Sequence, residues 1–358
     1  MMLLPSLPFA SHPRLRAFSV GVLGLTLAAL PCFGGDTYNG AQPTNAKDHK
    51  GKKITVTDIP KIIGIGYFDA TAKGIKEAAD EISKKAGFSV TTDGPTEGDI
   101  SKQVEFLDNA ASSGVDGLMF AANDPVAISP VLRKALKAGI TVVGYDADSQ
   151  PDARTWFVQM ATPDGVAKAI VDSMVKDIGG SGDIAIVTSS LTAPGQNAWI
   201  AEIKKYIAGN KIPLNIVTIL PSEEDQQLAF NKTGEIVKAY PNVKGIIGLS
   251  SVAGPGVADA ISRAGLIGKV KVVSLSTPNQ MKPFLKSGAV NYNILWNPVD
   301  LGYAAGYVMR ASVDGTLKPG DAEVDAGRLG KLKIINGSQV LLGAPTVFTK
   351  DNVDKFNF

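Results

Sequence analysis

The sequence of 358 residues has a single cysteine, Cys32, and two histidines, His12 and His49. Cys32 and His12 fall within residues 1–34, which we expect to be cleaved off, so the mature chain would contain no disulfide. His49 alone supports neither a typical zinc site nor a histidine-dependent catalytic triad. The scarcity of both residue types predicts a protein without a metal or other cofactor, stabilised by its hydrophobic core.

Motifs of several enzyme classes and of nucleic-acid-binding proteins are also missing. The run Ala253-Gly254-Pro255-Gly256 lacks the Lys-Ser/Thr pair of a phosphate-binding loop and contains a proline, so it predicts a helix start. No Gly-x-Ser-x-Gly nucleophile motif occurs. A net charge of +2 without a strong basic patch predicts no nucleic-acid partner. We therefore expect a protein that is not an enzyme.

The N-terminus has the pattern of a signal peptide. Arg14 and Arg16 precede an apolar segment from Phe18 to Leu30, which is too short to span a bilayer, and Gly34 follows it. We expect a signal peptide over residues 1–34, cleaved near Gly34, and export to the periplasm. The polar residues 35–52 predict a flexible lead-in to the folded part.

From Ile54 onwards, short apolar segments alternate with segments whose apolar residues recur at helical spacing. This alternation predicts parallel sheets with right-handed crossovers, and the length suits two α/β domains. We expect an N-terminal lobe over residues 53–158 and a C-terminal lobe over 159–296. Residues of about 297–335 would return to the first lobe, and about 336–358 would complete the second.

Polar side chains follow the predicted strands, and ligands of open parallel sheets bind at the carboxyl ends of the strands. Asp146 directly follows the strand over residues 141–145. It is the best candidate to anchor a ligand, because a carboxylate accepts hydroxyl protons in strong hydrogen bonds. The alternative is a helix cap or a solvated loop residue. Asn123 ends another strand of the same lobe and could reach the ligand, whereas Asp124 is expected to cap the next helix.

Two further polar candidates lie near predicted helix starts or in loops. Gln196 opens a helix of the second lobe, and its amide can both donate to and accept from a sugar hydroxyl; a helix cap at Asn197 is an equal alternative. Lys61 lies in a loop flanked by apolar residues, where it is either solvated or donates to a ligand oxygen. The acidic run at residues 223–225 predicts a solvated helix start.

Aromatic residues at loop positions over strand ends predict a surface that stacks on a sugar ring. Tyr67 and Phe68 precede the first predicted helix, and Trp296 follows a strand. Each alone is more often a core residue, but together they favour a binding site beside the polar strand ends. Trp156 and Trp199 are expected to lie in the core.

Several stretches of the chain match one protein family. Together they resemble the periplasmic substrate-binding proteins of ABC sugar importers of the ribose-binding type, in the branch that binds autoinducer-2 or rhamnose. The stretches are Ile59–Phe68, Asp93–Glu97, Ser276–Pro283 and Phe348–Val353, with Trp296–Tyr303 similar to the rhamnose binders. The resemblance implies a type I periplasmic binding protein fold, with two Rossmann-like lobes joined by a three-segment hinge and the ligand between them.

The resemblance also assigns site residues. Lys61, Asp146 and Gln196 match positions that contact the furanosyl autoinducer, and Tyr67, Phe68 and Trp296 match positions that meet the sugar in ribose-type relatives. The chain differs from the autoinducer branch at three positions. Gly195 stands where that branch has an aspartate, and Leu249 and Ser251 stand where it has proline and alanine.

The sequence therefore predicts an exported, monomeric solute receptor for a small sugar, with a deoxyhexose such as rhamnose favoured. The receptor would deliver its ligand to an ABC permease in the inner membrane. Hinge closure would retain the ligand, because only the closed form brings both lobes into contact with it. The alternatives are an autoinducer-2 receptor for uptake or signalling and an exported enzyme that acts on a sugar.

Overall fold

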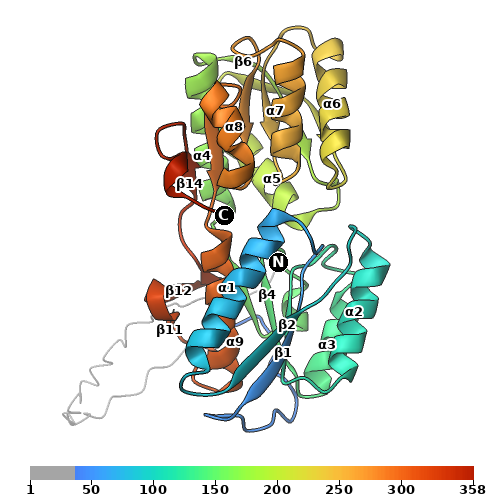
Figure 1. The fold of residues 1–358 in the computed structure, drawn as a ribbon, viewed down its shortest axis with the longest axis vertical. Helices are drawn as coiled ribbons and strands as arrows, with labels where there is room; N and C mark the ends of the chain where they lie inside the picture. The colour runs from blue at the N-terminus through green and yellow to red at the C-terminus, as the bar shows by residue number, and fades with distance from the viewer. Residues whose placement is uncertain (1–36) are drawn as a thin grey trace, which may run out of the picture. The chain divides into compact units, whose positions relative to one another are not determined.

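Two mainly parallel β-sheets with helices on both faces build residues 37–358, the part of the chain that the computed structural model describes (Figure 1). The predicted signal peptide over residues 1–34, its cleavage near Gly34 and Cys32 lie outside this part. Residues 37–358 belong to one compact unit. The two sheets confirm the predicted α/β class and divide this unit into two lobes.

The first lobe is built on an eight-stranded sheet. Its elements are β1 (Ile54–Ile59), α1 (Gly66–Ile82), β2 (Phe88–Thr92), α2 (Ile100–Ser112), β3 (Gly117–Phe120), α3 (Ser129–Lys137), β4 (Thr141–Tyr145), β5 (Trp156–Gln159), α9 (Pro298–Val313), β11 (Glu323–Asp325), β12 (Lys331–Ile335) and β13 (Gln339–Leu341). The strand order is β11-β12-β13-β5-β4-β3-β1-β2, and only β11–β12 and β12–β13 are antiparallel pairs. Helices α1 and α9 cover one face, and α2 and α3 cover the other.

The second lobe is built on a six-stranded sheet in the order β14-β10-β9-β8-β6-β7, in which only β14 is antiparallel to its neighbour. Its elements are α4 (Pro163–Ile178), β6 (Gly182–Thr188), α5 (Pro194–Gly209), β7 (Leu214–Pro221), α6 (Gln226–Ala239), β8 (Val243–Gly248), α7 (Ala253–Arg263), β9 (Lys271–Ser274), α8 (Pro278–Ser287), β10 (Tyr292–Leu295) and β14 (Thr346–Phe348). Helix α4 packs on one face with α5, and α6 and α7 pack on the other.

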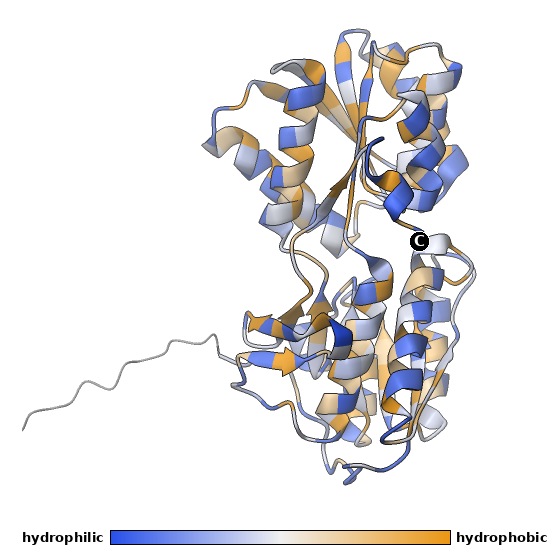
Figure 2. Ribbon diagram, turned by 60° about the vertical axis from the view of Figure 1, so that its left-hand side comes forward, coloured by the Kyte–Doolittle hydropathy of each residue, from blue (hydrophilic) through white to orange (hydrophobic). Residues whose placement is uncertain are grey.

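The central strands form because they can bury both of their faces. All residues of β3 and β4 are buried, and continuous apolar runs are typical of parallel strands covered by helices on both sides. Figure 2 shows the helices with hydrophobic and hydrophilic residues mixed along their length, as expected for elements with one face on a sheet. Helix boundaries follow the sequence signals: Asp99 caps α2, and left-handed Gly179 ends α4.

The N-terminal end of α1, which carries Tyr67 and Phe68, is fixed by close packing against α9. A Cβ atom on Gly74 would lie 1.9 Å from the carbonyl oxygen of Val299, and one on Gly302 would lie 2.0 Å from that of Thr71. Both distances are far below van der Waals contact, so any side chain at either glycine would push the two helices apart. This contact therefore holds the start of α1 at the edge of the first sheet.

The chain passes between the sheets three times: after β5, after β10, and between Leu341 and Thr346. The last crossing was expected near residue 336, but β13 pairs in parallel with β5 and extends the first sheet to Leu341. A strand of three residues is too short to give a clear sequence signal.

Residues 37–52, expected to be a flexible lead-in, instead pack on the first lobe. The Tyr38 hydroxyl donates to the carbonyl of Thr155 at 2.9 Å, and its ring meets Trp156 edge-on with centroids 5.2 Å apart. The Ala41 amide donates to the carbonyl of Arg154. Although the segment is mostly polar, its one aromatic residue at position 38 packs on the first lobe, and backbone hydrogen bonds attach further residues of the segment to the same lobe. None of the helices in residues 37–358 combines the length and hydropathy of a membrane span.

Candidate functional site

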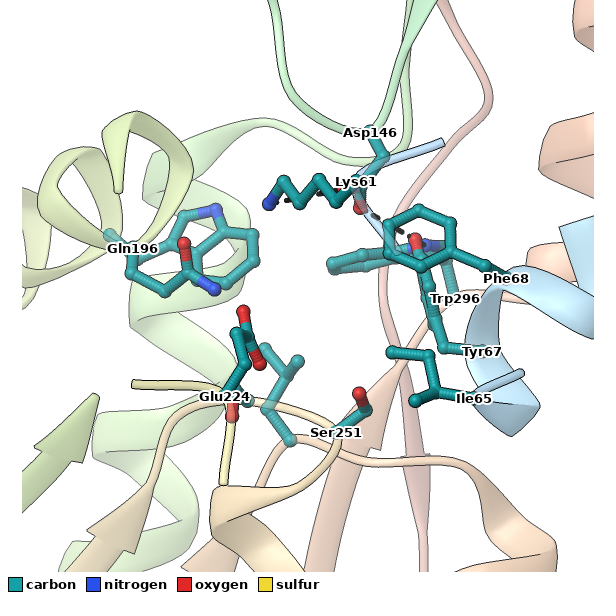
Figure 3. Close-up of a pocket in the computed structure, with 12 residues that line it drawn as sticks. Lys61, Ile65, Tyr67, Phe68, Asp146, Gln196, Glu224, Ser251 and Trp296 are labelled. Atoms are coloured by element: carbon teal, nitrogen blue, oxygen red, sulfur yellow. Dashed lines mark hydrogen bonds and ion pairs between the residues drawn. The ribbon is translucent and has the colours of Figure 1, made fainter. Parts of the chain in front are cut away.

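A pocket of about 380 Å³, partly open to solvent, lies between the two lobes at the carboxyl ends of their strands (Figure 3). This is the edge at which ligands bind in open parallel sheets. Seven of the ten predicted site residues line it. The lining residues are Lys61, Ile65, Tyr67, Phe68, Asp146, Gln196, Trp199, Glu224, Ser250, Ser251, Leu275 and Trp296.

Asp146 is the centre of the first lobe's side of the pocket. It follows β4 in a left-handed backbone conformation, with φ of 61°, and its carboxylate has two partners. The Tyr67 hydroxyl donates to Oδ1 at 2.7 Å, and Lys61 Nζ lies 3.4 Å from Oδ2. Both charged side chains are nearly buried, at 12% and 10% exposure. The carboxylate is therefore oriented and charge-balanced before any ligand arrives, and Lys61 points inward rather than into solvent.

Aromatic rings surround this carboxylate. Trp296 Nε1 donates to the Tyr67 hydroxyl at 2.8 Å, so one hydroxyl links the indole to Asp146. The rings of Tyr67 and Phe68 meet edge-on at 5.1 Å, and those of Trp199 and Trp296 lie 5.7 Å apart. Such rings give a flat apolar surface with polar atoms at its edge.

A second carboxylate, that of Asp58, lies buried behind the pocket and holds the strand that positions Asp146. Asp58 is fully buried in β1 and accepts from the Tyr145 hydroxyl at 2.9 Å and from Thr92 Oγ1 at 3.1 Å. Burial raises the pKa of Asp58 to about 7, although both hydroxyls lower it. Tyr145 directly precedes Asp146, so this bond helps to hold the end of β4. Burial also raises the pKa of Tyr67 well above its ordinary value, with Asp146 adding to the shift, which keeps the Tyr67 hydroxyl a donor.

Asn123 acts on the backbone of the Lys61 loop. Its side-chain Nδ2 donates to the Lys61 carbonyl at 2.8 Å, and its backbone amide donates to Gln103 Oε1. Asn123 does not line the main pocket but a neighbouring cavity of about 520 Å³, which shares Lys61 and Glu224 with it. Asp124 accepts from the backbone amides of Val126 and Ala127 in the turn before α3. The expected cap is therefore wrong, because the N-cap of α3 is Ile128, which has no side-chain cap bond.

The second lobe contributes polar side chains that are largely unpaired. Gln196 lies in the first turn of α5 and is 6% exposed, and Ser251 follows β8. Neither side chain makes a hydrogen bond to another residue in the part of the chain described. The proposed cap at Asn197 is wrong, because the N-cap of α5 is Ala193 and the Asn197 side chain instead donates, through Nδ2, to the carbonyl of Leu191.

Besides Asn123, two predicted site residues do not line the pocket. Leu249, which directly follows β8, is fully buried in the second lobe's core. Gly195 has no side chain to reach the pocket, and a Cβ atom there would approach the Trp199 ring at 4.0 Å. Their roles in binding stay predictions.

The sequence analysis missed Trp199 and Glu224. Trp199 is buried as expected, but it also lines the pocket; its spacing of three residues from Gln196 on α5 was the available signal. Glu224 belongs to the acidic run that was expected to be solvated. Only Asp225 of that run acts as a helix cap, accepting from the Leu228 amide. Residues 37–358 contain no group of three or more His, Cys, Asp or Glu that could hold a metal ion.

Comparison with known proteins finds a match to the family described as periplasmic binding protein domain over residues 58–317. The D-ribose/D-allose-binding protein of Pseudomonas aeruginosa is 27% identical over 245 residues, which are 67% of this chain and 76% of that protein. The family match over residues 58–317 includes every residue that lines the pocket.

Two solved structures are also similar. A solute-binding protein of an ABC transporter from Clostridium phytofermentas, with bound L-rhamnose, is 30% identical with a TM-score of 0.78, and the match covers 85% of this chain and 98% of that one. LsrB from Clostridium saccharobutylicum, in complex with AI-2, is 26% identical with a TM-score of 0.79, covering 85% and 100%. The type I periplasmic binding protein fold is therefore established.

Proposed function

Because the chain belongs to the periplasmic sugar-binding proteins of ABC transporters, in the ribose-binding family, we propose that its cleft captures a deoxyhexose such as rhamnose. Membership of this family makes the protein a non-catalytic solute receptor, exported and partnered by an ABC importer. The alternative of a sugar-acting enzyme is thereby excluded. The identity of the sugar is the proposed part.

The observation that carries the proposal is the pairing of Asp146 with Tyr67 and Lys61 against an aromatic wall. A sugar presents hydroxyls at its edge and C–H groups on its faces. A carboxylate accepts two hydroxyl protons, a lysine donates to ring or hydroxyl oxygens, and aromatic rings cover the C–H face. The fixed carboxylate therefore suits a hydroxyl-rich ring.

Two apolar residues support a deoxyhexose in particular. Ile65 and Leu275 line the same pocket from opposite lobes. A deoxyhexose such as rhamnose has a methyl group where other hexoses have a hydroxymethyl, and burying a methyl group in contact with apolar side chains is favourable by about 0.8 kcal/mol. A hydroxymethyl in the same place would leave a polar group without a partner.

Capture would follow from closure of the two lobes. The three crossing segments connect lobes that each supply part of the pocket. A ligand that contacts both sides favours the closed form by its differential affinity. The closed, loaded receptor would then deliver the sugar to the permease in the inner membrane.

A thermal-shift screen followed by calorimetry tests the proposal. L-rhamnose, D-ribose, D-allose, D-arabinose and AI-2 would be added to the purified mature protein. At a hundredfold excess over Kd, mass action adds about 2.7 kcal/mol to the free energy of unfolding, which raises Tm measurably. We expect L-rhamnose to bind more tightly than the other sugars. A larger stabilisation by another ligand would reject rhamnose, and no stabilisation by any would reject the sugar receptor.

AI-2 is the second candidate ligand. Lys61, Asp146 and Gln196, which match autoinducer-contacting positions, all line the pocket. Gly195 lacks the carboxylate of that branch, which favours rhamnose. Introducing it as Gly195→Asp should strengthen AI-2 binding relative to L-rhamnose, as measured by competition.

A further inference from the structure

Glu224 is an acidic residue of the second lobe whose place in the pocket the sequence did not predict. Figure 3 shows its side chain beside Gln196, in the space that faces the aromatic residues of the first lobe. It makes no ion pair within the described residues, in contrast to Asp146. Lys61 and Glu224 line both the main pocket and the neighbouring cavity, so they stand at the junction of the two spaces.

The backbone around Glu224 is held in an unfavourable conformation. Six non-glycine residues of the described chain have positive φ, and three of them line these two cavities: Asp146, Glu223 and Glu224. A left-handed conformation costs about 1–2 kcal/mol for a residue with a Cβ atom. Such outliers persist where the surroundings fix them, and they concentrate at functional sites.

The surroundings that fix this loop belong to the end of β6. The Ser222 amide donates to the carbonyls of Thr188 and Ser189, and the Glu223 amide also donates to the carbonyl of Ser189. Asp225 then caps α6. Glu224 is thus held from both sides, so the strained turn points its side chain into the cleft instead of into solvent.

We propose that Glu224 is the ligand-contacting carboxylate of the second lobe, which binds a hydroxyl of the captured sugar opposite Asp146. This inference rests on the proposed function and adds a specificity-determining residue to it. Each lobe then presents one acidic side chain from a left-handed turn at a strand end, and the sugar is bound between the two.

The charge balance of the cleft gives this role a measurable signature. The charged groups that face Glu224 are Lys61 and Asp146 from the first lobe and Glu223 from its own loop. Burial raises the pKa of Glu224, Lys61 lowers it, and Asp146 raises it. A sugar hydroxyl that donates to Glu224 favours the ionised carboxylate, so binding releases a proton and affinity falls as pH falls.

Calorimetry on four forms of the mature protein tests the proposal: wild type, Glu224→Ala, Glu224→Gln and, as a control, Glu235→Gln. The probe is whichever of L-rhamnose, D-ribose and D-allose binds wild type most tightly. We expect Glu224→Ala to weaken binding about tenfold or more, because a charge-assisted hydrogen bond contributes roughly 1.5–3 kcal/mol. Glu235→Gln, on the exposed side of α6 where it pairs with Lys232 outside both cavities, should stay within about twofold.

The pH profile separates a ligand contact from a structural effect. Between pH 8 and 5.5, wild-type affinity should fall as Glu224 takes up a proton, whereas Glu224→Gln should bind with nearly constant affinity. Thermal unfolding without ligand checks that all variants fold. Unchanged affinity in Glu224→Ala, or a pH slope that survives in Glu224→Gln, would overturn the role of Glu224 alone. No binding of any sugar to wild type would overturn the proposed function and this inference with it.

Discussion

The two lobes share one architecture but present different surfaces to the cleft. In the first lobe, Tyr67, Asp146 and Lys61 are bonded to one another, and Trp296, at the crossing from β10 to α9, is bonded to Tyr67. In the second lobe, the side chains of Gln196 and Ser251 have no hydrogen-bond partner within residues 37–358. One surface is assembled before ligand arrives, and the other is completed by it.

This difference assigns different energetic roles to the lobes. Side chains already fixed by hydrogen bonds lose little conformational freedom on binding, so their contacts contribute most of their strength to affinity. Side chains that are still unpaired lose more freedom when the lobes close. We expect changes on the first lobe's surface to weaken binding more than equivalent changes on the second.

Asp146→Ala should have the largest effect, a loss of affinity of about 100-fold or more, because two charge-assisted contacts disappear and Lys61 is left without its partner. Asp148→Asn is a matched control. Asp148 pairs with buried Arg154 at 2.8 Å outside the pocket, so its loss should lower Tm but leave Kd unchanged. Calorimetry and thermal unfolding measure both, and equal Kd values for Asp146→Ala and wild type would contradict the comparison.

Asp58→Asn should change how the stability of the protein depends on pH. With a folded-state pKa of about 7 and an unfolded value near 3.9, the native carboxyl holds a proton between these values that the unfolded chain has lost. The contribution of Asp58 to the free energy of unfolding is therefore greatest below about pH 4 and falls as pH rises to about 7, by about 2 kcal/mol between pH 5 and 7.

The asparagine stays neutral, so urea unfolding of Asp58→Asn should lose this decline. Persistence of the same decline in the variant would mean that another group is responsible. Ligand affinity at pH 5 should be close to that of wild type, since Asp58 does not line the pocket.

Tyr67→Phe should weaken binding about tenfold, because Asp146 loses a hydrogen bond that orients it and Trp296 Nε1 loses its acceptor. The ring remains, so stacking is preserved. Tyr303→Phe removes a hydroxyl from the far side of the first lobe, where it donates to Glu81, and should leave Kd unchanged. Similar affinities for both variants would show that the hydrogen bonds of the Tyr67 hydroxyl do not contribute to ligand affinity.

Gln196→Ala should have the smallest effect, about three- to fivefold in Kd, because an unpaired amide on the second lobe contributes one neutral hydrogen bond. Asn197→Ala, its neighbour outside the pocket, should change only Tm through the lost bond to Leu191. A loss for Gln196→Ala as large as that for Asp146→Ala would remove the distinction between the lobes.

The sequence predicted most of the first lobe's surface, because Asp146 directly follows β4, Lys61 lies just after β1, and Tyr67 and Phe68 lie at the start of the first helix. The pattern that identified Asp146 depends only on strand ends, which parallel sheets bring to one edge. Glu224 was not predictable in the same way. The acidic run around it has the sequence pattern of a helix start. Its side chain enters the cleft only because hydrogen bonds to the end of β6 hold the backbone in a left-handed conformation.

Connections between the lobes were also less predictable than the lobes themselves. Strand β13 has three residues, and its place in the first sheet depends on pairing with β5, which lies far away in the sequence. The prediction of a flexible lead-in was wrong for a similar reason. The contact of Tyr38 with Trp156 joins residues far apart in the sequence, so the sequence pattern does not indicate it.

The contact between Gly74 of α1 and α9 has a consequence for biosynthesis. Helix α9 begins at Pro298, far along the chain from β1 to β5, which supply most of the first lobe's core. In a nascent chain that ends before Pro298, the face of α1 that packs on α9 is exposed to solvent, and strands β11 to β13 have not yet been synthesised. The first lobe to be translated is therefore among the last to be finished, and a late stop codon would damage the start of the molecule as much as its end.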